Sequence, residues 1–360
     1  MSRHTIASRR SLAGGCRRVA LVLVPVLIGS GPARADGPPI DGIEAAGPLA
    51  VTRTGQTLSV LERSRRRVLA VDPADAAKRW VAFDAPGDDA ATIAAIASLD
   101  SSTLLAVWHD DGEWSVRVHR VRPPGEEAGG GATLQSISLG RSTNATPRVR
   151  IVVAPSREVL AVAGLPAPLP GLVRGRITGA RIEPLSEKRC PSLAGQALRD
   201  VAFGPGDEWV LLTTPADAPA GPARLSWVAP GGQSSLLDLD TGLVDVGDTA
   251  WDADGGSLYA IGGRRGSATH PRGVWRLDAA LEDRRQICRA RCVARVEDPL
   301  ALVCLPRYQG QGVVTRRDGA RIVVAPLSLA DEPDPRPGGR GGPGDDGRKA
   351  GTPDDAGEDS

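Results

Sequence analysis

Hydrophobic and polar positions recur in one arrangement along the middle of the chain: a short apolar run, a tight polar turn, and a second, more strongly apolar run. The clear copies follow a weaker first one. The paired runs are Leu49–Val51 with Leu58–Val60, Ile96–Leu99 with Leu104–Val107, Ile151–Val153 with Val159–Val162, Val201–Phe203 with Trp209–Leu212, and Thr249–Trp251 with Leu258–Ile261. The second runs begin 46, 55, 50 and 49 residues apart. A regular period of this length predicts a repeat architecture.

After each pair there is room for two further strands, whose residues alternate between apolar and polar as half-exposed strands do. These outer segments include Trp114–Val121, Gly171–Ile182, Ala223–Val228 and Gly273–Leu277. The last unit is less regular and reads as Val293–Val296, Ala301–Leu305, Gly312–Thr315 and Ala320–Val324. Four short strands in a unit of about 40 to 50 residues are typical of a β-propeller blade.

We therefore predict an all-β fold: a β-propeller of about six four-stranded blades over residues 36–330, with five or seven blades left open. Closing the units into a ring buries both faces of the apolar strands and leaves no long free sheet edge. The rival fold is a pair of β-sandwiches, which the regular four-strand period disfavours.

The first 35 residues have the three parts of a secretory signal peptide. Five arginines precede a short apolar run, Val19–Ile28, and the small-x-small triplet Ala33-Arg34-Ala35 follows it. We predict cleavage after Ala35 and an exported bacterial protein, periplasmic or extracellular. Ser8–Leu12 also resembles a twin-arginine signal, so the export route stays open. The apolar run is too short for a transmembrane helix, and none is predicted.

Residues 331–360 are rich in Gly, Pro and Asp and contain almost no apolar residue. Such a segment cannot bury enough surface to offset chain entropy, so a disordered acidic tail is predicted. The whole chain carries a formal net charge of +1. The absence of a basic excess argues against nucleic-acid binding, which needs a positive surface.

Four cysteines lie beyond the signal segment: Cys190, Cys288, Cys292 and Cys304. An even number in an exported protein favours two disulfides, with the connectivity open. Cys288 and Cys292 are the local candidate pair. The same segment has three histidines, His109, His119 and His270, and no metal site is predicted from them.

The strand–turn–strand units resemble those of WD-like, quinoprotein-like and lactonase-like propellers. Val68–Pro73 with Trp80 resembles the strand-then-Trp segment of quinoprotein repeats. The resemblance covers about 290 residues and implies the fold rather than an activity. The chain departs from the lactonase pattern at the calcium-binding positions, because Asn144 is its one asparagine.

Within that resemblance, a sugar-oxidising quinoprotein holds pyrroloquinoline quinone with cationic side chains and uses a His or Asp as base. The resemblance implies His109 or His270 as that base and Arg265 as the anchor of an anion. Both regions are also explained as solvated hairpin turns, at His109–Gly112 and Arg264–Gly266.

No nucleophile elbow, phosphate loop or His-Glu-x-x-His motif occurs in the chain. The sequence therefore favours a monomeric, non-catalytic binding or scaffold module without a cofactor, whose partner is a protein or polysaccharide. The alternative is a quinoprotein-like oxidoreductase acting on a sugar or alcohol, with pyrroloquinoline quinone and Ca²⁺.

Overall fold

The computed structural model describes residues 39–40, 43, 46–52, 54–84, 92–126, 132–144, 148–187, 193–204, 206–230, 235–252, 257–266, 272–282, 285–306 and 310–329. The chain divides into two compact units, Met1–Ala33 and Arg34–Ser360, and every described residue belongs to the second. The predicted signal peptide and acidic tail lie outside the described residues. Helical structure is almost absent from the described part, where Arg63–Arg65 form a 3-10 helix.

The described strands form antiparallel sheets in which most strands pair with the next one along the chain. The first sheet contains β1 (Ala46–Val51), β2 (Leu58–Glu62), β3 (Arg67–Asp72) and β4 (Asp75–Asp84), and the second contains β5 (Thr92–Ser98), β6 (Thr103–Asp110), β7 (Glu113–Arg120) and β8 (Thr133–Arg141). The third contains β9 (Arg150–Val153), β10 (Val159–Ala163) and β11 (Leu172–Thr178), with the short strands β12 (Arg181–Ile182) and β13 (Ser186–Glu187) both paired to β11.

A longer sheet follows, made of β14 (Gln196–Phe203), β15 (Trp209–Pro215), β16 (Pro222–Val228), β17 (Ser235–Val244), β18 (Thr249–Asp252), β19 (Ser257–Arg264), β20 (Gly273–Glu282) and β21 (Arg285–Ala294). Among the described residues, strand pairing joins its two halves where Leu243 and Val244 of β17 pair with Arg264 and Gly263 of β19. The last sheet contains β22 (Pro299–Cys304), β23 (Gln311–Asp318) and β24 (Arg321–Ser328).

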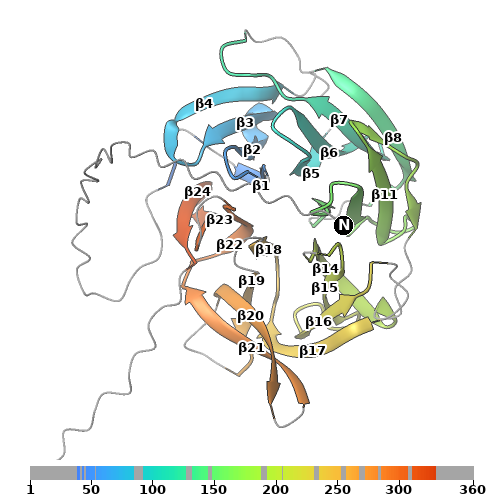
Figure 1. Cartoon of the computed structure of the whole chain (residues 1–360), viewed down its shortest axis with the longest axis vertical. Coiled ribbons are helices and arrows are strands. Elements are labelled where there is room, and N and C mark those ends of the chain that lie inside the picture. The colour runs from blue at the N-terminus through green and yellow to red at the C-terminus, as the bar shows by residue number, and fades with distance from the viewer. Residues whose placement is uncertain are drawn as a thin grey trace, which may run out of the picture. The chain divides into compact units, whose positions relative to one another are not determined.

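The sheets lie around a common centre, as Figure 1 shows, in a propeller-like arrangement. The strands nearest that centre contact one another in a closed cycle: β1 with β5, β5 with β9, β9 with β14, β14 with β18, β18 with β22, and β22 with β1. The all-β propeller prediction is therefore confirmed at the level of the fold.

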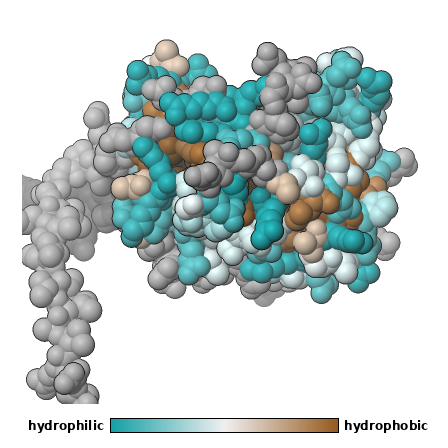
Figure 2. All heavy atoms as spheres, turned by 90° about the horizontal axis from the view of Figure 1, so that it is seen from above, coloured by the Kyte–Doolittle hydropathy of each residue, from teal (hydrophilic) through white to brown (hydrophobic). Residues whose placement is uncertain are grey.

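The second strand of each unit is buried on both faces, as its uninterrupted apolar sequence predicts. In β6, Leu105 and Val107 pack toward the third sheet, whereas Leu104, Ala106 and Trp108 pack toward the first. Successive side chains of a strand point to opposite faces, so one apolar strand contributes to two sheet–sheet interfaces. The face drawn in Figure 2 is mostly hydrophilic, and the large apolar side chains exposed among the described residues are Leu134 and Leu300.

The last unit differs from its predicted strands. Val293, expected to begin that unit, instead lies in β21, and the last sheet has three strands. The backbone N–H of Ile40 donates to the carbonyl of Val324 in β24 at 2.8 Å. An N-terminal segment thus supplies the partner that the last sheet's edge needs, which the local strand pattern could not reveal.

The predicted disulfide between Cys288 and Cys292 is wrong. Both cysteines lie on β21, which is extended at this point. Their Cα atoms are therefore about 13 Å apart, whereas a disulfide needs roughly 4.4–6.8 Å. Cys288 and Cys304 are free thiols in the structure, and Cys190 lies outside the described residues.

No helix within the described ranges is long and apolar enough to cross a membrane.

Candidate functional site

Three charged side chains from successive units converge where the innermost strands begin. Arg150 starts β9, Asp200 lies in β14, and Asp248 immediately precedes β18. The Nε of Arg150 lies 3.1 Å from Oδ1 of Asp200, and its Nη1 lies 2.9 Å from Oδ1 of Asp248. The two carboxylates are 1% and 7% exposed, and Arg150 is 18% exposed. The site is therefore a buried network of one guanidinium and two carboxyl groups.

Neighbouring backbone and hydroxyl groups complete the network. Asp200 accepts hydrogen bonds from the Val201 N–H at 2.8 Å, from the Thr249 hydroxyl at 2.7 Å, and from the Thr249 N–H. Oδ2 of Asp248 accepts the N–H of Leu302, in β22, at 2.7 Å. The network therefore links β9, β14, β18 and β22 at one end of the ring.

The environment of Asp248 changes its acidity. Burial, together with the charge of Asp200, raises the pKa of Asp248 to about 7, although Arg150 acts in the opposite direction. Burial alone would lower the pKa of Arg150, but the charges of Asp200 and Asp248 outweigh it and raise that pKa. One guanidinium cannot neutralise two buried carboxylates, so near neutral pH the network holds or releases a proton at Asp248.

A second group of charges lies beside this network. Burial and the nearby charge of Arg148 lower the pKa of Arg199, whereas Asp245 acts in the opposite direction. Arg148 donates through Nη1 to the carbonyl of Val246 at 2.8 Å, and Nε of Arg272 lies 3.5 Å from Oδ2 of Asp245. Among the described residues this group contains three arginines and one carboxylate, which leaves it with a positive excess.

Several buried polar atoms near these arginines have no hydrogen-bond partner among the described residues. They are Oε1 of Gln196 and Nε of Arg199 in β14, and the hydroxyls of Thr213 and Thr214 in the paired part of β15. Buried polar groups almost always have partners. Thr213 and Thr214 are consecutive in β15, so their side chains point to opposite faces and do not both face the arginines. Nε of Arg199 lies within the cationic cluster and, without a partner among the described residues, can donate to a polar, anionic group.

The connection between β17 and β18 brings the two groups together. Asp245 has φ 47 in the left-handed region, which an aspartate tolerates better than most residues. Gly247 donates to the carbonyl of Ile261 at 2.9 Å. This turn directs Asp245 toward the arginine cluster and Asp248 toward Arg150. The four-residue segment 245–248 therefore contributes a carboxyl group to each of the two charged groups.

The residues singled out from the sequence are placed as follows. His109, at the end of β6, stacks on Trp114 with ring centroids 4.6 Å apart, and its buried Nε2 has no partner in the described part of the chain. His109 pairs with Thr92 at the start of β5, and β9 packs on β5 and β6. His109 therefore lies at the end of the ring where Arg150 begins β9.

Arg265 is already paired: its Nη2 lies 2.8 Å and 3.0 Å from the two carboxylate oxygens of Asp240, on β17. No hydrogen bond or ion pair joins His109 to Arg265 among the described residues. His270 lies outside them. The catalytic and anion-anchoring roles of these three residues stay predictions.

Sequence reasoning missed Arg148, Arg150, Asp200 and Asp248. The signal was present, because each lies directly before the apolar residues of an innermost strand. Arg150, Asp200 and Asp248 are also about fifty residues apart, which is the repeat period itself. Polar positions that recur with the period at strand starts indicate a shared end of the ring.

No protein-family model matches the sequence, and no curated protein matches it. Among solved structures, the chain is similar to the PQQ-bound aldose sugar dehydrogenase of Streptomyces coelicolor, with TM-score 0.52 and 13% identity over 83% of this chain and 99% of that one. It is also similar to a gluconolactonase from Xanthomonas campestris (TM-score 0.48, 15% identity, 80% and 88% coverage). A calcium-binding regucalcin from Agrobacterium tumefaciens gives TM-score 0.48 and 14% identity over 81% and 92%. The chain is thus a β-propeller protein of no specific family.

The similarity with TM-score 0.52 corrects two predictions. The first is a non-catalytic scaffold for a protein or polysaccharide, and the second is the absence of a cofactor. The solved structure of TM-score 0.52 is a dehydrogenase with bound PQQ, so both are wrong as leading interpretations. The physical reason is that they relied on missing motifs. In a propeller, groups that act together come from different units, as Arg150, Asp200 and Asp248 do here, and no contiguous motif is needed.

Proposed function

We propose that the chain is a quinoprotein-like oxidoreductase acting on a sugar, with its site where β9, β14 and β18 begin. The observation that supports this most strongly is the carboxyl group of Asp248, whose pKa is raised to about 7 beside a cluster of under-neutralised arginines. A proton acceptor works best with a pKa near the working pH, and strongly perturbed groups concentrate at functional sites.

The residues fit pyrroloquinoline quinone by charge. This cofactor carries carboxylates, and when bound it supplies the acceptor for the hydride removed from the sugar. Arg199 has a buried Nε with unmet hydrogen-bonding capacity, and Arg148 lies close enough to lower its pKa. A carboxylate placed there would relieve the repulsion between the two guanidinium groups and complete the missing hydrogen bond.

Asp248 is proposed to take the proton of the sugar hydroxyl that is oxidised. Arg150 holds the ionised carboxylate in place, and Asp200, whose oxygens are fully engaged, holds Arg150 and Thr249. His109 stays a second candidate for the same role, since it lies at the same end of the ring and its Nε2 is unpartnered within the described residues.

Calcium fits less well. No group of three or more His, Cys, Asp or Glu side chains in the described part of the chain is arranged to hold a metal ion. We therefore assign no residue to Ca²⁺, and its requirement is left to the assay below.

The finer architecture belongs to the same proposal. The closed cycle of innermost strands has six members, and the longest sheet is held together at its middle by two residue pairs. These two observations support six blades, the longest sheet counting as two. We further propose export with removal of residues 1–35, and a monomeric protein.

The proposal is tested with the purified chain reconstituted with pyrroloquinoline quinone, with and without Ca²⁺, on a panel of aldoses and alcohols. Dye reduction reports turnover, and calorimetry reports quinone binding separately. We expect aldose oxidation that rises with pH through about 7, because Asp248 must be ionised to accept a proton.

Four variants, one of them a control, assign the roles. Asp248→Asn should lower kcat by about 100-fold or more and remove that pH dependence, while Arg199→Gln should weaken quinone binding. Arg141→Gln, an exposed residue paired with Asp111, is the control and should change neither. A loss of turnover in His109→Gln with normal turnover in Asp248→Asn would move the proton acceptor to His109. Quinone binding without oxidation of any substrate would overturn the proposal.

A further inference from the structure

A cleft opens at the opposite end of the ring from the Asp248 network. Its volume is about 470 Å³, within the range of small-molecule sites. It is formed by the turn after β5, the turn after β9 and the end of β11. Arg150 begins β9, and Arg157 follows the end of the same strand, so the two sites are separated by the length of that strand.

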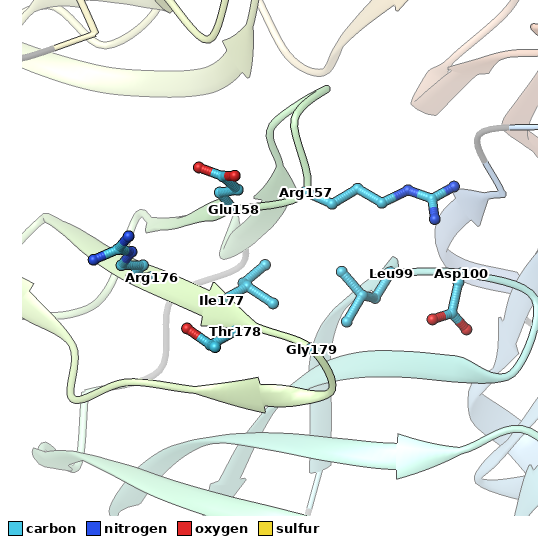
Figure 3. A pocket seen from close by; sticks show the side chains of 8 residues that line it. All are labelled: Leu99, Asp100, Arg157, Glu158, Arg176, Ile177, Thr178 and Gly179. Carbon is cyan, nitrogen blue, oxygen red and sulfur yellow. The ribbon is translucent and has the colours of Figure 1, made fainter.

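The floor of the cleft is apolar. Leu99 and Ile177 are each 5% exposed and belong to the cluster between the second and third sheets. Figure 3 shows their side chains facing one another at the base of the cleft. A ligand lying here would place an apolar surface against these two side chains.

The walls carry two guanidinium and two carboxyl groups. Arg157 and Asp100 lie toward one end, and Arg176 and Glu158 toward the other (Figure 3). None of the four forms an ion pair among those found between described residues. Oδ1 of Asp100 accepts the N–H and the hydroxyl of Ser102 at 2.7 and 2.8 Å, which leaves Oδ2 for a ligand. The formal charge of the lining is zero.

The turn that presents Arg157 is held in an uncommon conformation. Arg157 has φ 62 in the left-handed region, where Gly, Asn or Asp is favoured. The turn is fixed by its own bond from the Arg157 N–H to the Ala154 carbonyl at 2.9 Å. A second bond, from the Ser156 N–H to Asp207 of the neighbouring sheet, measures 3.1 Å. The strained backbone, held by these two hydrogen bonds, places the guanidinium of Arg157 over the cleft. Strained backbone conformations of this kind are concentrated at ligand sites.

From this lining we infer that the cleft is a second, non-catalytic binding site for a neutral saccharide unit. A guanidinium only donates hydrogen bonds and a carboxylate only accepts them, whereas each sugar hydroxyl does both. Adjacent hydroxyls can therefore satisfy both kinds of group at either end of the cleft, while the C–H face of the ring packs on Leu99 and Ile177. A simple anion or cation would be repelled by half of the lining. The inference does not depend on the proposed oxidoreductase activity.

The test uses the full chain without quinone. Native affinity electrophoresis in gels containing dextran, and calorimetry with maltotriose, should both detect binding. Arg157→Gln and Arg176→Gln should each weaken it about tenfold, because each removes a charged hydrogen-bond donor. Arg181→Gln changes an exposed arginine of β12 that does not line the cleft, and it should bind normally.

Asp248→Asn should also bind dextran normally, which separates this site from the one at the other end of the ring. The inference is overturned if dextran and maltotriose do not bind, or if Arg181→Gln weakens binding as much as the cleft variants do. It is equally overturned if the cleft binds triglycine or inorganic phosphate in place of the saccharides.

Discussion

At the scale of single residues, the buried network around Arg150 is distinguished by its charge balance. Two carboxyl groups share one guanidinium, and both are nearly inaccessible to water. With both carboxyls ionised, the network carries one surplus negative charge. Burial, together with the charge of Asp200, therefore raises the pKa of Asp248, because protonation removes that surplus. The same property that suits Asp248 to proton transfer makes it a source of instability at high pH.

We expect the loss of folding stability caused by ionising Asp248 to be measurable. The folded pKa of Asp248 is about 7 and its ordinary value is 3.8. Its contribution to stability is therefore complete below pH 3.8 and is lost as the pH rises to about 7. Asp248→Asn mimics the protonated form, so its unfolding free energy should match wild type near pH 4 and exceed it by about 4 kcal/mol at pH 8. Urea denaturation at both pH values measures these free energies. The same difference between variant and wild type at pH 4 and at pH 8 would contradict the raised pKa.

His119 has the opposite dependence. It is 1% exposed, and its Nε2 accepts a hydrogen bond from Nε1 of Trp108 at 3.0 Å. Burial, and then the charge of Arg117, lower the pKa of His119 to about 4 from 6.5. The unfolded chain takes up a proton in this window before the folded one does, so His119 lowers stability as the pH falls from 6.5 toward about 4.

His119→Gln keeps an acceptor for Trp108 and should remove this acid sensitivity, worth about 3 kcal/mol across the window. In wild type the slopes from His119 and Asp248 oppose each other over the same pH range. His119→Gln should therefore reveal the pH dependence of stability that Asp248 causes, and Asp248→Asn should reveal the one that His119 causes. Urea denaturation at several pH values measures both, and parallel profiles for wild type and His119→Gln would show that His119 is not neutral in the fold.

The two kinds of residue could be predicted to different degrees. Leu104, Val107 and their equivalents could be assigned to buried strands from their apolar runs alone. The roles of Arg150, Asp200 and Asp248 could not, because a charged residue before a strand is usually solvated. Only closure of the ring brings the three side chains within hydrogen-bonding distance. Their distances depend on strand tilt and spacing, which cannot be read from a local sequence pattern. His109 and Arg265 drew attention through local charge density, which does not report which residues meet.

At the scale of elements, β9 is positioned by a close backbone approach. Gly164, at the end of β10, has φ 75 and donates to the carbonyl of Gly171 at 2.9 Å. A Cβ at this position would overlap the carbonyl oxygen of Arg148. Only glycine therefore allows β10 to hold the segment that carries Arg148 and Arg150.

Gly164→Ala should destabilise the fold by about 3 kcal/mol, because it adds a backbone collision to an unfavourable φ. It should also weaken quinone binding by displacing Arg148. Gly319→Ala is the matched control: Gly319 has φ 60 and no atom within 4 Å of the added Cβ, so it should cost only about 1 kcal/mol. Thermal unfolding and calorimetry check both variants, and equal losses would exclude a role for the close approach.

Strand identity and order could be read from the sequence because each strand–turn–strand unit is local. The hairpin at Asp318-Gly319 joins β23 to β24 as its turn residues predict. The failures are non-local. Val293 was assigned to the wrong unit because its apolar run looks like the start of a new strand, whereas it is the end of β21, which extends to Ala294. The Cys288–Cys292 pair was chosen by nearness in sequence rather than by strand geometry.

At the scale of the whole molecule, the ring closes between the first and last sheets. Leu49, Leu58 and Val60 share a buried cluster with Val313 and Val324. These residues lie more than 250 positions apart in the chain, so their contact forms only when every intervening unit is in place. The closed cycle could be predicted from the repeat period, since an open array would expose an apolar face at each end. The contacts that close the ring could not be predicted from that period.

The N-terminal segment provides that means. Ile43 is 3% exposed within the closing cluster, and the neighbouring Ile40 donates its N–H to Val324. Ile43→Ala removes buried apolar volume between the two ends of the chain and should cost about 2–5 kcal/mol. Leu134→Ala trims a side chain that is 51% exposed and should stay within about 0.5 kcal/mol of wild type. Because the closing contacts join units that are otherwise linked only through the whole ring, Ile43→Ala should also broaden the unfolding transition in urea. The ring would close without the N-terminal segment if Ile43→Ala lost no more unfolding free energy than Leu134→Ala and left the slope of the urea transition unchanged.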